Sequence, residues 1–229
     1  MYQDIITIAV VTVIAFYALY RMWFQGEVDG SRLIAKQSMA PQKVNIIILL
    51  VAAFIIKTIL AVRNEGYSVD ISCFRAWSET VFTGGISHFY EGDVADYPPG
   101  YMLILWLVGA LRHLFDIDIN STTGLFMIKL FPMLFDLAAA YLIYIMAKKR
   151  FSEGMSLMLS ALYALNPAVV IDSSVWGQVD GVLCCMVLLT CYLFMEEKRI
   201  LAYFSFCAGV LLKPQMVMFA PIIIYSIIE

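Results

Sequence analysis

Two hydrophilic stretches of an otherwise apolar chain combine acids with aromatic and amide neighbours. GYSVDISCFRAW and its sequel SHFYEGDVADYPPGY carry Asp70 and Asp96, and NPAVVIDSSVWGQVDG carries Trp176, Gln178 and Asp180. A carboxylate can accept a proton as a general base, and indole and amide N–H groups can donate hydrogen bonds to a bound molecule. Helix capping is the alternative, because Asp70 directly precedes an amphipathic pattern and Asp96 precedes the YPP sequence that begins the next apolar segment.

A third candidate, Lys213 in LLKPQ, lies near the middle of the last apolar segment. A cation at that depth is costly unless it meets an anion, and the adjacent Pro214 can break the helix. The pattern predicts either a seat for a phosphate group or an ion pair, for which Asp136 is the obvious partner. Lys57 and Lys129 lie near the ends of their apolar segments, where we expect them to snorkel towards water.

Composition excludes a water-soluble globule. Of the 229 residues, 62% are apolar and 14% are charged, against roughly a quarter charged in soluble domains. The net charge of −3 and the lack of a basic tract exclude nucleic acid as a partner. The cysteines show no disulfide or zinc spacing.

The apolar segments predict an all-α, polytopic transmembrane bundle with about six crossing helices. A span needs about 20 apolar residues, and lipid offers no partner to unpaired backbone groups. The candidate segments are approximately 4–24, 44–62, 98–115, 124–147, 155–172, 181–195 and 200–228.

Basic residues decide the topology. If 98–115 does not cross, nine Lys and Arg residues lie on one side and three on the other, which is the usual bias towards the cytoplasm. We therefore expect 98–115 either to lie along the outer surface or to dip into the membrane and return, within an outer loop at 63–123. The same loop is expected to carry a short amphipathic helix in the headgroup region. SSVWGQVDG then faces the same compartment.

The order of these motifs resembles the GT-C superfamily of membrane glycosyltransferases. The motifs are Asp70, Phe74 and Trp77 at D-x3-F-x2-W spacing, then DYPPGY, WGQVD and LLKPQ. The likeness spans 44–229 and is greatest to bacterial and archaeal mannosyltransferase-like members and to glucosyltransferases that extend the lipid-linked oligosaccharide. Residues 1–43, with one further span and a basic cytoplasmic loop, look like an addition.

The resemblance implies inverting transfer of a hexose, mannose or glucose, from a polyprenyl-phosphate or dolichyl-phosphate donor on the extracytoplasmic face. Asp70 corresponds to the catalytic acid, and Asp96 falls in the second acidic motif. The residues expected to bind the donor sugar or its phosphate are Lys213, Gln215, Gln178, Trp176, Asp180 and Tyr97. A divalent metal, Mg or Mn, could bind Asp70, Asp96 and Asp180, since hard cations prefer carboxylate oxygens.

Family members generally continue with further spans, so the chain is expected to be an N-terminal module, a truncated chain or half of a split protein whose second chain supplies the remaining helices. A prokaryotic plasma membrane is favoured over the ER. Two alternatives stay open. One is a transporter that uses Lys129, Asp136 and Lys213 as coupling charges. The other is a donor-binding scaffold without catalysis.

Overall fold

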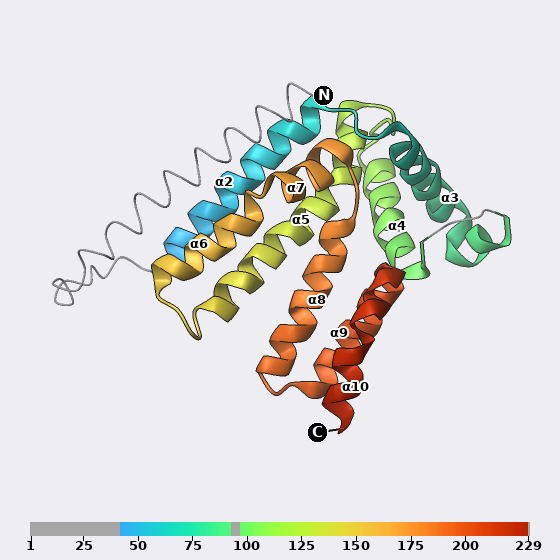
Figure 1. The fold of residues 1–229 in the computed structure, drawn as a ribbon. Coiled ribbons are helices and arrows are strands. Elements are labelled where there is room, and N and C mark those ends of the chain that lie inside the picture. The colour runs from blue at the N-terminus through green and yellow to red at the C-terminus, as the bar shows by residue number, and fades with distance from the viewer. Residues whose placement is uncertain (1–41, 93–96, 229) are drawn as a thin grey trace.

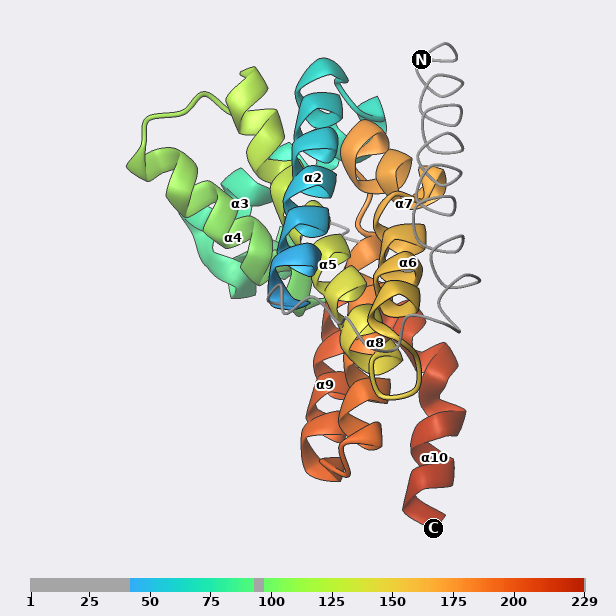
Figure 2. The same cartoon turned by 90° about the vertical axis from the view of Figure 1, so that its left-hand side faces the viewer.

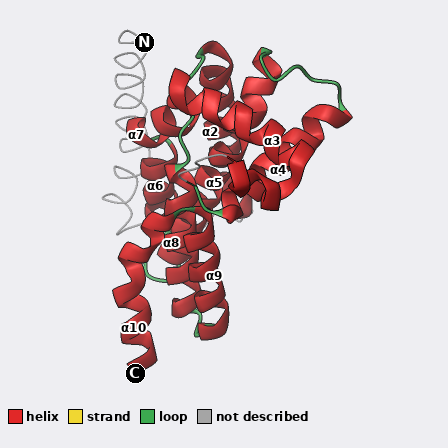
Figure 3. Cartoon of the chain, turned by 90° about the vertical axis from the view of Figure 1, so that its right-hand side faces the viewer, coloured by secondary structure: helices red, strands yellow, loops and turns green. Residues whose placement is uncertain are grey.

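The computed structural model describes residues 42–92 and 97–228, which form helices joined by short connections (Figures 1 and 3). No strand occurs in these two ranges, so the predicted all-α class is confirmed. The helices are α2 (Gln42–Arg63), α3 (Ser68–Gly92), α4 (Pro99–Leu114), α5 (Thr122–Ala147), α6 (Glu153–Ala164), α7 (Pro167–Val170), the π-helix η2 (Ile171–Trp176), α8 (Asp180–Met195), α9 (Arg199–Leu212), the 3-10 helix η3 (Pro214–Phe219) and α10 (Ala220–Ile228). The predicted span at 4–24 and its basic loop lie outside the described residues.

Helix α5 is the centre of the bundle and packs against α2, α6 and α8. Its start is capped by Ser121, whose hydroxyl accepts the Gly124 amide at 3.0 Å. Helices α3 and α4 pair with each other and extend to one side of the bundle (Figure 2). Helix α4 begins where expected, at the Pro98–Pro99 pair that presets the helical backbone.

Two described helices are long and apolar enough to cross a membrane, residues Asn45–Arg63 of α2 and Thr122–Ala147 of α5. A third span is possible if α6 and the α7–η2 segment count as one, although they are bent by 49°. The bend follows Asn166, whose side chain caps α7 by accepting the Ala168 amide at 2.9 Å. The expected continuous helix at 155–172 is therefore broken.

The predicted single span at 200–228 is wrong. The chain leaves α9 at Lys213, which has an extended backbone with φ −149° and ψ 119°, and then reverses through η3 into α10. The Ser226 carbonyl consequently accepts from Arg199 at 3.4 Å, and the Ser226 hydroxyl lies 3.4 Å from that of Tyr203. A proline after an extended residue has turned one apolar segment into a helical hairpin.

The amphipathic pattern after Asp70 does form a helix, but its apolar face packs against protein. Ile71, Phe74 and Val81 are buried in a core shared with α4 and α5, so this face is not available to the headgroup region. Helix α4 is not among the helices that pass the length and hydropathy test for a span. The side of the membrane that each loop faces stays a prediction.

Candidate active site

Asp70 lies in the first turn of α3 and accepts two side-chain hydrogen bonds on one carboxylate oxygen. The Trp176 indole N–H and the Gln178 amide both donate to Oδ2 at 3.0 Å. No other hydrogen bond to this carboxylate occurs within 42–92 and 97–228, so Asp70 does not cap its own helix there. Two segments separated by more than 100 residues thus meet, as expected from their predicted placement on the same side.

Two glycines with left-handed backbones let these segments approach. Gly66 has φ 87° and precedes α3, whereas Gly177 has φ 89° and ends η2. A Cβ at Gly177 would lie 2.7 Å from Ile71 Cδ1 and one at Gly66 would lie 2.7 Å from the Trp176 carbonyl, so only glycine fits either position. The Tyr67 amide donates to that carbonyl at 2.8 Å.

Gln178 links Asp70 to Tyr97. The Tyr97 hydroxyl donates to Gln178 Oε1 at 3.0 Å, and the Val179 amide donates to the same oxygen at 3.0 Å. The Tyr97 ring packs edge-on against Phe74, which holds the phenol in place. Nearby, partial burial raises the pKa of Tyr90, whose hydroxyl donates to the Tyr97 carbonyl at 2.8 Å.

Lys213 lies at the reversal between α9 and η3, and its ammonium group is paired with Asp180. Its side chain is 7% exposed, against 56% for that of Asp180, and its Nζ lies 5.9 Å from the centre of the Tyr97 ring. The alternative pairing with Asp136 is wrong. Gln215 lies two residues further on, and is exposed in η3.

Asp136 instead pairs with Lys57, whose Nζ lies 2.8 Å from Oδ2 and also donates to the Val169 carbonyl at 3.1 Å and the Ser173 hydroxyl at 3.0 Å. Lys57 and Lys129 are both fully buried, so the prediction that they snorkel is wrong. Lys129 meets only carbonyl oxygens in the described ranges. The position of a lysine along a span does not show whether its side chain faces the lipid or the protein interior. Lys57 and Lys129 both face the interior, where they contact residues far away in sequence.

The predicted metal site stays untested. Asp96 lies outside the described residues, and within them no group of three or more His, Cys, Asp or Glu gathers as a possible metal ligand set. Asp70 and Asp180 are engaged by Trp176, Gln178 and Lys213 instead.

Asp172 was not selected from the sequence. It lines a cavity of about 220 Å³ together with Asp136 and Asp180. Its place in an apolar segment, where an acid is costly, was the signal that could have identified it.

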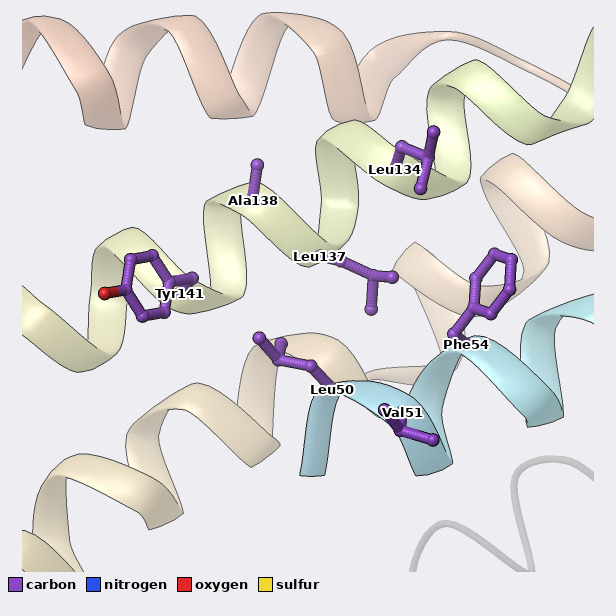
Figure 4. Close-up of a pocket in the computed structure, with 7 residues that line it drawn as sticks. All are labelled: Leu50, Val51, Phe54, Leu134, Leu137, Ala138 and Tyr141. Carbon is purple, nitrogen blue, oxygen red and sulfur yellow. The ribbon is translucent and has the colours of Figure 1, made fainter. Parts of the chain in front are cut away.

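A second, apolar groove of about 360 Å³ lies between α2 and α5 (Figure 4). Leu50 and Phe54 from α2 face Leu134 and Leu137 from α5 across it. It offers no group for chemistry, because its lining is almost entirely hydrocarbon.

Comparison with known proteins identifies the family. The sequence model of the dolichyl-phosphate-mannose-protein mannosyltransferase family matches residues 96–229, which is more than half of the chain. The match includes the YPPG, WGQVD and LLKPQ motifs but begins after Asp70. No curated protein and no solved structure matches significantly. The chain is an integral membrane protein that belongs to the dolichyl-phosphate-mannose-protein mannosyltransferase family of GT-C glycosyltransferases.

Proposed function

We propose that this protein transfers a hexose, mannose or glucose, from a polyprenyl-phosphate-linked donor to a hydroxyl acceptor, with inversion and on the extracytoplasmic face. One observation carries the proposal. The Asp70 carboxylate is oriented by Trp176 and Gln178, and the same network reaches Lys213 through Tyr97. A base and a cation that belong to one network of contacts are what inverting transfer from a lipid phosphate requires.

Asp70 would act as the general base. Both donors occupy Oδ2, and within the described parts of the chain no hydrogen bond engages Oδ1. That oxygen is therefore available to take the proton from an acceptor hydroxyl while the hydroxyl oxygen attacks the anomeric carbon from the face opposite the phosphate. The bond to the phosphate oxygen breaks as the new glycosidic bond forms, so a single base is sufficient.

Lys213 would stabilise the departing phosphate. The lipid phosphate is already a good leaving group, so the site must supply positive charge and needs no general acid. Asp180 holds the ammonium group in place and, because it is half-exposed, could also accept a donor hydroxyl. Trp176 is 46% exposed, so its ring could stack on a sugar face. Gln215 is available to contact the donor from η3.

Asp96 is proposed as the second acidic residue of the site, and a divalent cation shared with Asp70 and Asp180 is a further proposal that the assay can test. The basic-residue count supports the extracytoplasmic face, and the DYPPG and WGQVD motifs would then meet there. Further helices that complete the acceptor site could come from a second chain.

The test measures sugar transfer from a radiolabelled polyprenyl-phosphate hexose in liposomes, with and without Mg²⁺ or Mn²⁺. Asp70→Asn should reduce transfer by about 100-fold or more, the usual range for a general base. Glu65→Gln is the matched control, since Glu65 is an exposed acid in the same loop. This variant should transfer sugar at the wild-type rate. Normal transfer by Asp70→Asn would show that the base is assigned wrongly.

A further inference from the structure

Lys129 makes an unusual set of contacts for a buried cation. It is fully buried in α5, and its ammonium group donates to four backbone carbonyls, those of Asn64 at 2.7 Å, Ser174 at 3.0 Å, Val175 at 3.3 Å and Ala61 at 3.4 Å. In the part of the chain that the structure describes, it forms no ion pair with a carboxylate. The charge therefore interacts with carbonyl dipoles alone.

The four carbonyls belong to the ends of two helices. Ala61 and Asn64 lie at the C-terminal end of α2, and Ser174 and Val175 lie at that of η2. The last carbonyls of a helix have no partner within it, and that end carries partial negative charge. The Lys129 ammonium group therefore gives carbonyls at both helix ends a hydrogen-bond donor and offsets the partial negative charge there. It also connects the two ends to each other.

Both segments of the candidate site leave from this point. The chain after Asn64 turns through Gly66 into α3 and reaches Asp70, while the chain after Val175 continues to Trp176 and Gln178. The Tyr67–Trp176 backbone hydrogen bond joins the same two segments. A shift of either helix end would change the distance between Asp70 and its two donors.

We propose that Lys129 is a positioning residue, which holds Asp70 in register with Trp176 and Gln178 by fastening together the ends of α2 and η2. Its effect on transfer rests on the proposed function, but its effect on geometry does not. Lys57 differs, because it pairs with the Asp136 carboxylate and donates to the Val169 carbonyl and the Ser173 hydroxyl, and not to the last carbonyls of α2 or η2.

The test follows the indole N–H proton resonance of Trp176 in the intact chain in detergent micelles, assigned with Trp176→Phe. Its hydrogen bond to a carboxylate is charge-assisted, so Asp70→Asn should move the resonance. Lys129→Met should move it as well. Met133→Ala is the matched control, since Met133 is also fully buried in α5 and its truncation lowers thermal stability, but a methionine donates no hydrogen bond to the four carbonyls.

In the transfer assay Lys129→Met should lower kcat by about 100-fold, the cost of a misplacement near 1 Å, with little change in the donor KM. If Lys129→Met does not fold, Lys129→Gln keeps two N–H donors but reaches less far, and should give a smaller movement in the same direction. A resonance that stays in place in a folded Lys129 variant, while Asp70→Asn moves it, overturns the proposal. If Lys129→Met moves the resonance but the wild-type protein transfers no sugar, the positioning role is upheld. In that case it is the proposed glycosyl transfer that is refuted.

Discussion

Replacing the buried ion pair between Lys57 and Asp136 tests whether these two charges only stabilise the fold or are also needed for transfer. Lys57→Met leaves the Asp136 carboxylate, on a side chain that is 2% exposed, without its counter-charge. Asp136→Leu likewise leaves a buried ammonium group without a carboxylate. The double variant Lys57→Met/Asp136→Leu removes both charges and keeps side chains of similar volume.

The structure sets the magnitudes. Unit charges 2.8 Å apart attract by about 6 kcal/mol at an effective dielectric of about 20, and desolvation offsets most of that gain. Each single variant should therefore lower the free energy of unfolding by about 3–5 kcal/mol. The double variant also loses the donations to Val169 and Ser173, at about 1 kcal/mol each, so it should cost only about 2 kcal/mol.

The free energies come from reversible unfolding in mixed SDS micelles, and transfer activity is measured on the same preparations. We expect the double variant to be more stable than either single variant and to retain transfer. A double variant as unstable as the two single losses added together would refute the reasoning about the pair. Loss of transfer in a folded double variant would show that the two charges are needed for transfer as well as for stability.

Three further predictions concern other parts of the chain. Lys213→Met should raise the donor KM about tenfold but cost only about 1 kcal/mol of stability, because its half-exposed carboxylate partner can be hydrated; an equal loss of both would contradict a phosphate-binding role. Gly181→Ala should destabilise the fold by about 1–3 kcal/mol in the same unfolding assay, because its Cβ would collide with the Asp136 carboxylate, whereas the exposed Gly84→Ala should not destabilise it. In a variant without other cysteines, Cys73 should react with a membrane-impermeant thiol reagent only from the extracytoplasmic side, and labelling only from the cytoplasm would invert the topology.

The sequence was most informative where a local pattern determines local structure. The Pro98–Pro99 pair marks the start of α4 correctly, and the periodicity after Asp70 predicts the helix that carries it. The aromatic and amide residues of WGQVDG do meet that helix. These predictions succeed because each depends on a few neighbouring residues and on the general rule that loops on one side can touch.

The partners of the buried lysines were not predictable. Lys57 and Asp136 are 79 residues apart, and nothing local distinguishes a lysine that snorkels from one that turns inwards. The hairpin at Lys213 was mistaken for one span because total length and hydropathy cannot distinguish a crossing helix from two short helices that fold back. Proline marks the break but not its angle, which depends on packing against α8.

The π-helical turn makes the backbone conformation of one short segment matter as much as its composition. In η2 the amides of Gly177 and Gln178 both reach back to the Asp172 carbonyl at 2.9 Å, so this turn holds more residues than an α-helical one. If the same residues formed an ordinary α-helix instead, each turn would hold one residue fewer, and everything after the segment would be rotated by about 100°, which is one residue's share of a turn. The indole and the amide would then point away from the carboxylate even though every side chain were still present.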